Sequence, residues 1–189
     1  MIKYLKCDFK AAKEGGDVMK IKTREMVYCA LFAALTAVFS QIIIPIGLVP
    51  INLATLSVLL CGAVLGKKYG SLSIFIYVVL GAVGVPVFAS FKGGLSVLAG
   101  PTGGYILGYI AMAFLTGLGF EKYEKMLSRV LMMVLATLVC YTFGTAWFMI
   151  SAKADFVYSL FTCVLPFLPF DAVKIAICYI AADRIRKVM

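Results

Sequence analysis

Residues 26–66 read MVYCALFAALTAVFSQIIIPIGLVPINLATLSVLLCGAVLG, a run without a single charged side chain. A helix needs about 20 apolar residues to cross the hydrocarbon core of a bilayer, so this run is long enough for two crossings. Pro45 and Pro50 would interrupt a continuous helix near its middle. The run therefore predicts two membrane helices, over roughly 26–44 and 52–66, with the chain turning back between them.

Further stretches of the chain carry no charge. They cover 69–91, 93–120, 130–152 and 156–170. All but the last are long enough for a crossing, and Pro166 and Pro169 interrupt the last one. The further membrane helices that we expect lie over roughly 69–90, 100–120, 129–151 and a final stretch that reaches about residue 183.

The composition agrees with this interpretation, because 63% of the 189 residues are apolar and only 14% are charged. Soluble domains are about 45–50% apolar and about 25% charged, so a soluble enzyme is excluded. We predict an all-α, polytopic protein of the cell membrane with six transmembrane helices. It would consist of a basic N-terminal arm, residues 1–24, and a single six-helix membrane domain, residues 25–189.

The 18 Lys and Arg residues give the chain a net charge of +9, and most of them fall on one side of the predicted helices. These groups are the arm 1–24, the pair Lys67–Lys68, the loop 121–129 and the tail from Arg184. The loops of the opposite side hold only Lys92 and Lys153, while Lys174 lies inside the last helix. Since Lys and Arg mark cytoplasmic loops, we expect both termini in the cytoplasm.

The positive charge does not indicate nucleic-acid binding. It is spread over several edges of the predicted bundle and forms no basic helix face with interleaved aromatic residues. Lysines beside a membrane usually face anionic lipid. We therefore expect the lipid bilayer, and no nucleic acid, as the partner of these charges.

Several kinds of chemistry are missing from the chain. It has no histidine, and its six cysteines are too far apart for a metal-binding or redox pair. The glycine-rich stretch 93–104 lacks the Gly-Lys-Ser/Thr ending of a phosphate loop, and no hydrolase motif is present. We therefore expect no enzyme activity, no metal and no cofactor, and any energy for active work would have to come from a partner or an ion gradient.

Asp171 and Lys174 are the charges that break the pattern, because they lie within an otherwise apolar segment. Residues three apart on a helix are neighbours, and charged groups at membrane depth usually face a cavity or each other. A purely structural ion pair is one interpretation. We favour a ligand-binding role, since a fixed acceptor beside a fixed donor suits a polar, ring-shaped ligand.

A second candidate region lies where the third helix should reach the outer side. Glycines and a proline interrupt the apolar run there, around Phe88, Lys92, Gly93 and Gly94. Non-helical backbone at this depth is tolerated when it is buried in protein or lines a cavity. A plain loop is one interpretation, and a lid over a small-molecule site is the other.

The stretch Gly100-Pro101-Thr102-Gly103-Gly104-Tyr105 follows directly. Gly100, Gly104 and Gly108 are spaced by four, so they would line one face of a helix and permit close helix packing. Thr102 and Tyr105 could add hydrogen bonds to a ligand at the outer end of that helix. Small residues also recur in the first helix, as Ala30, Ala33, Ala34 and Ala37. These alanines could pack inside the bundle or form a flat face for another membrane protein.

Together these segments resemble the BioY family, the biotin-specific S components of energy-coupling-factor (ECF) vitamin transporters. The resemblance covers roughly residues 25–187. It rests on Val49–Leu53, on Leu65-Gly66 with Tyr69-Gly70, on Gly84–Phe88, on Gly93-Gly94 with Gly100–Tyr105, and on Pro166–Pro169 with Asp171 and Lys174. The alanines at 30, 34 and 37 resemble the small-residue element through which S components dock on their coupling subunit.

The resemblance implies a six-helix subunit that binds biotin from outside and is energised by its partners. Those partners would be a transmembrane coupling subunit and two cytoplasmic ATPase subunits. Asp171 and Lys174 match the polar pair expected at the biotin head, and Lys92 is a candidate for the biotin carboxylate. The residues that we expect at the substrate are Asp171, Lys174, Asn52, Phe88, Lys92, Gly93, Gly94, Gly100, Thr102, Gly103 and Tyr105.

The chain departs from the family pattern at one place. Members often have P-x-T-x-Q at the start of the second helix, whereas this chain has Pro50, Asn52 and Ala54. Asn52 keeps a hydrogen-bonding group, but Ala54 loses the glutamine amide, so the affinity or the preferred ligand could differ. The alternatives are an S component for thiamine or riboflavin and a membrane protein with only a structural role.

Overall fold

The computed structural model describes residues 23–44 and 51–188, and within them the chain is mostly α-helical. The helices are α2 (Thr23–Ser40), α3 (Ala54–Val83), α4 (Leu95–Ala99), α5 (Gly103–Lys122), α6 (Met126–Ala152), α7 (Phe156–Cys163) and α8 (Leu168–Val188). Two short strands, β1 (Ile43–Ile44) and β2 (Ile51–Asn52), pair antiparallel, and a 3₁₀ turn, η1, covers Ala89–Phe91. Most of the predicted basic arm and the two prolines at 45 and 50 lie outside the described residues.

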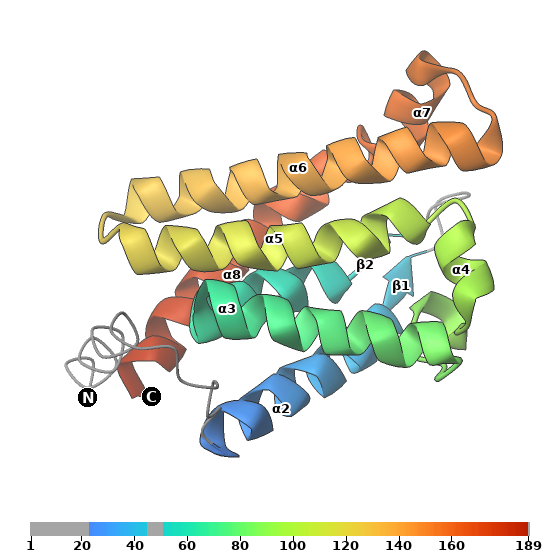
Figure 1. Cartoon of the computed structure of the whole chain (residues 1–189). Helices are drawn as coiled ribbons and strands as arrows, with labels where there is room; N and C mark the ends of the chain where they lie inside the picture. Colours follow the sequence, from blue (N-terminus) through green and yellow to red (C-terminus); the bar gives the residue numbers. More distant parts are fainter. Residues whose placement is uncertain (1–22, 45–50, 189) are drawn as a thin grey trace, which may run out of the picture.

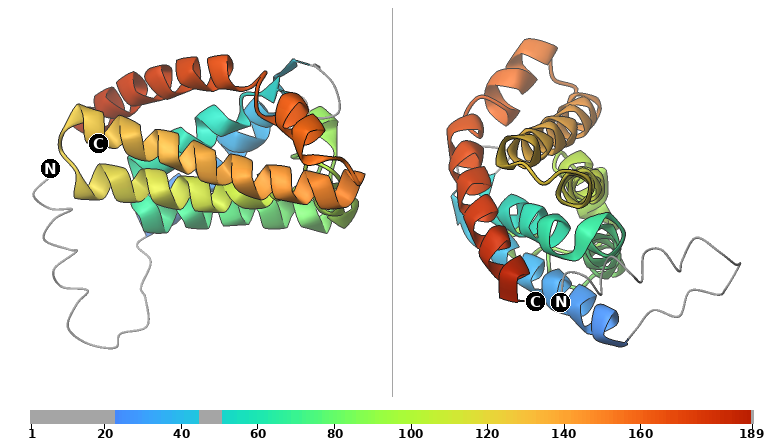
Figure 2. Two further views of the ribbon diagram at one scale, coloured as in Figure 1. Left: turned by 90° about the horizontal axis from the view of Figure 1, so that it is seen from above. Right: turned by 90° about the vertical axis from the view of Figure 1, so that its left-hand side faces the viewer.

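The long helices form a bundle with α3 and α5 at its centre (Figures 1 and 2). Helix α3 packs against α2, α5 and α8, and α5 packs against α6. The short elements α4, α7 and the β-hairpin gather at one end of the bundle (Figure 1). The helical fold class predicted from the apolar runs is thus confirmed.

Helix α3 is divided at Gly66, whose φ of +80° and ψ of 177° lie outside the helical region. Two contacts show that its halves fold against each other. The thiol of Cys61 donates a hydrogen bond to the carbonyl oxygen of Gly70 at 3.6 Å, and a Cβ added to Gly70 would lie 2.9 Å from the Cα of Gly62. In a straight helix, residues 62 and 70 would be about 12 Å apart along the axis. The chain therefore turns back at Gly66, between the two helices predicted over 52–66 and 69–90.

Four helices of the described residues, namely α2, α3, α5 and α6, are long and apolar enough to cross a membrane. The bent pair α7 and α8 would add a fifth span, with an angle of 46° between its halves. Pro166 lies in the break between them and Pro169 in the first turn of α8. The final helix predicted from the sequence is therefore divided into two helices, α7 and α8. This sets α8 at an angle that brings its first turn to the end of the bundle where α4 and the β-hairpin lie.

Close packing in the centre depends on small residues. A Cβ added to Gly104 would lie 2.2 Å from the Cβ of Trp147, and one on Gly108 would lie 3.1 Å from the sulfur of Cys140. Helices α5 and α6 thus approach each other along the glycine face predicted from the spacing. Gly100 precedes α5 and lies outside this face, but its carbonyl oxygen accepts a hydrogen bond from the indole N–H of Trp147 on α6 at 3.1 Å. Large apolar side chains are exposed on the outer surfaces of α2, α3, α5, α6, α7 and α8, as expected for a bundle in lipid.

Basic side chains meet at the end of the bundle opposite α4 and α7. Lys67 Nζ lies 3.6 Å from a carboxylate oxygen of Glu121. The guanidinium groups of Arg129 and Arg186 lie over the ring of Phe120, at 5.1 and 5.6 Å from its centroid. Three of the basic groups seen in the sequence are therefore neighbours in space, at one end of the molecule.

Candidate functional site

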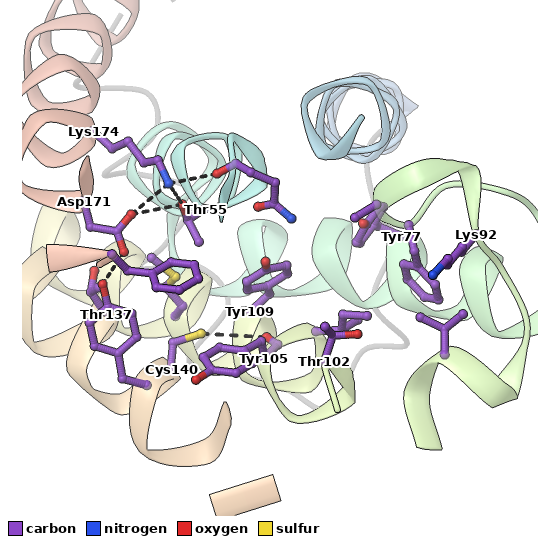
Figure 3. Close-up of a pocket in the computed structure, with 18 of the residues that line it drawn as sticks. Thr55, Tyr77, Lys92, Thr102, Tyr105, Tyr109, Thr137, Cys140, Asp171 and Lys174 are labelled. Carbon is purple, nitrogen blue, oxygen red and sulfur yellow. Dashed lines mark hydrogen bonds and ion pairs between the residues drawn. The ribbon is translucent and has the colours of Figure 1, made fainter. Parts of the chain in front are cut away.

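A cavity of about 130 Å³ lies at the end of the bundle opposite the basic residues. Side chains from α3, α5, α6 and α8 form its walls, and the segment between α3 and α4 covers it (Figure 3). Both the start and the end of α3 reach the cavity because that helix turns back at Gly66. The residues predicted from the sequence that line it are Asn52, Phe88, Lys92, Thr102, Tyr105, Asp171 and Lys174.

Asp171 and Lys174 lie in the first turns of α8, and both side chains are only 6% exposed. Lys174 Nζ is 2.8 Å from Asp171 Oδ1. Two charges taken out of water need further hydrogen bonds, because their mutual attraction alone barely offsets the lost hydration. The neighbouring elements supply these bonds.

Lys174 uses its ammonium group to hold α8 to the beginning of α3. It donates to the backbone carbonyl of Asn52 at 2.8 Å, to the hydroxyl of Thr55 at 2.9 Å and to Asp171. An ammonium group has three N–H donors, so all of them are engaged. A ligand carbonyl could bind Lys174 only by replacing one of these partners.

Asp171 keeps capacity for a ligand. Its Oδ2 accepts a hydrogen bond from the hydroxyl of Tyr141 on α6, and its Oδ1 accepts from Lys174 at 2.8 Å and from the hydroxyl of Thr55 at 3.5 Å. A carboxylate offers about four acceptor sites. The pair therefore presents Asp171 as a fixed, negatively charged acceptor for N–H groups of a ligand.

Tyrosine side chains form the middle of the pocket. Tyr105 and Tyr109 come from α5, and Figure 3 shows them between the Asp171–Lys174 pair and Lys92. Rings with polar tips provide a flat apolar surface together with hydrogen-bonding groups. The pocket thus offers an acidic acceptor at one side, aromatic walls, and a basic group at the other side. This arrangement suits a small ligand with N–H donors at one end and an anionic group at the other.

The four predicted glycines do not line the cavity but shape the backbone around it. Gly94 has φ of +96°, and its N–H donates to the carbonyl of Gly81 at 2.7 Å. A Cβ on Gly93 would lie 2.5 Å from the carbonyl oxygen of Val85, one on Gly103 only 1.7 Å from that of Leu98, and one on Gly100 would lie 3.3 Å from two carbonyl oxygens. The glycines permit the chain to fold tightly beside the pocket, and a direct contact of Gly93, Gly94, Gly100 or Gly103 with a ligand stays a prediction.

Sequence reasoning missed several polar residues of the site, above all Thr55, Tyr109 and Tyr141. Each is an uncharged residue in an apolar segment, where such residues commonly only pack. One signal was present, because Thr137 and Tyr141 stand four residues apart in α6 and both line the pocket. Polar residues at that spacing share a helix face, which in a membrane helix usually points to the interior.

The alanines predicted to dock a partner do not all share one surface. Ala30 and Ala34 are exposed and Ala37 is half-buried. Ala33 is only 4% exposed and packs in the core of the bundle. An outer face of α2 can therefore be formed by Ala30 and Ala34 but not by Ala33, which is turned toward the core of the bundle.

Comparisons with known proteins agree on one family. Residues 12–189 match the sequence profile of the BioY family. The chain is 43% identical to the "Probable biotin transporter BioY" of Pyrococcus horikoshii, over 88% of this chain and 98% of that protein. It is 40% identical to the "Biotin transporter BioY" of Thermotoga maritima, over 87% and 96% of the two chains.

A solved structure has the same fold. The crystal structure of the S-component for biotin from an ECF-type ABC transporter superposes with a TM-score of 0.82 and 26% sequence identity. The match covers 91% of this chain and 95% of that one. Both the sequence and the arrangement of helices are therefore those of one group of membrane transport proteins.

Proposed function

This chain belongs to the BioY family, and we propose that it is the biotin-binding subunit of an ECF-type vitamin uptake system in the cell membrane. It is a transport protein and not an enzyme. The observation that carries the proposal is the buried Asp171–Lys174 pair, which faces a pocket instead of the lipid. A pair with a structural role alone would not require a cavity beside it.

The chemistry of biotin suits the two sides of this pocket. Its ureido ring has two N–H groups and one carbonyl oxygen, and Asp171 is a fixed acceptor for those N–H groups. Tyr105 and Tyr109 would pack against the fused rings. The carboxylate of the valerate chain would point to Lys92, on the other side of the tyrosines in Figure 3. The ureido carbonyl would replace one of the present partners of Lys174.

We further propose six membrane crossings with both termini in the cytoplasm. The turn at Gly66 makes two crossings of α3, and α7 with α8 completes the six. The basic residues Lys67, Arg129 and Arg186 meet at one end, which the positive-inside rule assigns to the cytoplasm. The pocket at the opposite end then faces outward, where biotin is taken up.

Transport against a gradient needs an energy source outside this chain. A transmembrane coupling subunit with two cytoplasmic ATPase subunits would supply it, as the ECF type of the solved relative suggests. The exposed alanines of α2, Ala30 and Ala34, would provide a flat surface for docking on the coupling subunit, since small residues let helices approach closely.

A binding titration tests the proposed function. Detergent-purified protein is titrated with biotin, and with thiamine and riboflavin in parallel. We expect saturable binding of biotin alone. Folded protein that binds thiamine or riboflavin would make the chain an S component for another vitamin, and folded protein that binds none of the three would refute a vitamin-binding role.

A further inference from the structure

The pocket is covered by residues 84–94, called here the covering segment. Phe88 and Lys92 of this segment line the cavity. Phe88 is 1% exposed, and its ring meets that of Tyr77 edge to face at 5.6 Å. The tip of the ring lies against Gly81, where an added Cβ would be 2.1 Å from Phe88 Cζ. The segment therefore closes the pocket with a well-packed aromatic side chain.

One side chain of the neighbouring helix end holds both halves of the covering segment. The amide nitrogen of Gln41, just after α2, donates to the carbonyls of Val87 at 3.3 Å and Phe88 at 3.1 Å. Its amide oxygen accepts the N–H of Phe91 at 2.9 Å. Gln41 also contacts its own helix end, through the carbonyl of Ala37 at 3.2 Å and the hydroxyl of Ser40 at 3.1 Å. The amide thus bridges α2 to the two residues just before the turn η1 and to the last residue of that turn.

The turn that Gln41 bridges has an unfavourable backbone conformation. Ser90 has φ of +61° and Phe91 has φ of +53°. Residues with a Cβ rarely adopt this left-handed region, and two in succession are disfavoured further. Such a turn persists when surrounding contacts hold it, and the hydrogen bond from the N–H of Phe91 to Gln41 acts at that point.

The size of the cavity requires the covering segment to move. About 130 Å³ is well below the roughly 300–1,000 Å³ of typical small-molecule pockets. Of the helices that form the walls, α3, α5 and α6 are packed through glycines with little room to separate, and Lys174 joins α8 to the start of α3. A ligand of the size of a vitamin therefore enters by displacing the segment between α3 and α4.

We propose that Gln41 is a positioning residue that clamps the covering segment over the pocket and so couples closure of the pocket to the end of α2. The proposal rests on the proposed function, because α2 also carries the alanines assigned to docking. A displacement of α2 in the assembled transporter would pull on Val87, Phe88 and Phe91 through one amide group. The turn at Ser90 and Phe91 would then relax, and the pocket would open.

The test compares the variant Gln41→Ala with the control Ile42→Ala, whose side chain is half exposed and beside the clamp. The first measurement needs no ligand. Native Cys140 lines the pocket, so its rate of modification by a small, water-soluble methanethiosulfonate reagent, followed by peptide mass spectrometry, reports opening. We expect Gln41→Ala to raise this rate by about fivefold or more, as for the loss of one or two hydrogen bonds, and Ile42→Ala to leave it unchanged.

The second measurement is the dissociation rate of biotin from the same proteins, with the same expected ranking. The variant Gln41→Glu keeps the size of the side chain but has no N–H for the carbonyls of Val87 and Phe88, so it should also open the pocket. Unchanged Cys140 modification in both Gln41 variants would overturn the clamp. Wild-type protein that binds no biotin would instead refute the proposed function, while the Cys140 measurement would still decide on the clamp.

Discussion

Helix α8 carries two ion pairs of nearly equal length, one near each end. Lys174 Nζ lies 2.8 Å from Asp171 Oδ1 at the pocket, and Lys187 Nζ lies 2.7 Å from Asp183 Oδ2 at the basic end. The side chains of the first pair are 6% exposed, whereas those of the second are 71% and 36% exposed. The distances are alike, so the difference in energy and in role comes from burial.

In the exposed pair, water can replace the partner of either charge at little cost. Such pairs contribute about 0–1 kcal/mol to folding stability. The buried pair has lost its hydration and depends on other protein groups. Tyr141 from α6 and Thr55 from the start of α3 supply them. The ion pair at the pocket thus connects three helices, whereas the pair of similar length at the other end lies on the surface of α8 alone.

The largest effect is expected when one partner of the buried pair is removed. Lys174→Ala leaves the carboxylate of Asp171 buried without its cation, which costs about 3–5 kcal/mol of stability. We also expect biotin affinity to fall by at least about tenfold, or about 1.4 kcal/mol. Thermal unfolding and a biotin titration in detergent measure both. Lys187→Ala is the matched control and should change neither the stability nor the biotin affinity. Equal losses in the two variants would contradict the different roles assigned to the buried and the exposed pair.

Replacing both members of the buried pair separates stability from binding. Apolar residues of similar volume often restore the stability lost when one partner is removed. We expect Asp171→Leu combined with Lys174→Met to unfold near the wild-type temperature, because no charge is left unpaired. Biotin binding should stay lost, since the acceptor for the ureido N–H groups is gone. A double variant that binds biotin like the wild type would show that the pair is only structural.

A smaller effect is expected at Tyr141. Tyr141→Phe removes the hydroxyl that donates to Asp171 Oδ2 and leaves Lys174 in place. A hydrogen bond to a charged group contributes about 1.5–3 kcal/mol, part of which water in the pocket would replace. We expect roughly fivefold weaker biotin binding by titration. Thr142→Val, on the adjacent exposed side of α6, should bind as the wild type; if Tyr141→Phe does so too, Asp171 is positioned without this hydroxyl.

The smallest effect on biotin is expected on the outer face of α2. Ala34→Trp enlarges an exposed residue away from the pocket, so the titration should not change. Recovery of the coupling subunit in a pull-down should fall, because a flat surface becomes bulky. Leu131→Trp on the exposed surface of α6 is the control. Unchanged recovery with Ala34→Trp would place the docking surface elsewhere.

The parts of the molecule that could be predicted from sequence are those with a local signal. Uncharged runs bounded by Lys and Arg marked the helices, and Asp171 with Lys174 stood out as charges in an apolar segment. Pro166 and Pro169 predicted an interruption of the last helix, but the angle between α7 and α8 depends on packing against α3 and α6. Ala33 could not be assigned correctly for the same reason. A repeat of small residues indicates that a helix face packs closely, but it does not show which of these residues face outward.

The neutral polar residues of the pocket could not be assigned from sequence for a related reason. Tyr109, Tyr141 and Thr55 come from three helices and meet only after the chain turns back at Gly66. Their individual surroundings in the sequence are apolar and unremarkable. Gln41 is similar, because its role depends on five contacts, most of them with a segment more than forty residues away.

The role of Asp171 in biotin binding is measured by comparing the two acids of α8 in one experiment. Asp171→Asn and Asp183→Asn remove one negative charge each, from the same helix and with nearly the same change in shape. Equilibrium titration with biotin should show at least about tenfold weaker binding for Asp171→Asn and wild-type binding for Asp183→Asn. Folded Asp171→Asn protein that binds biotin as tightly as the wild type would contradict the assignment of the pocket.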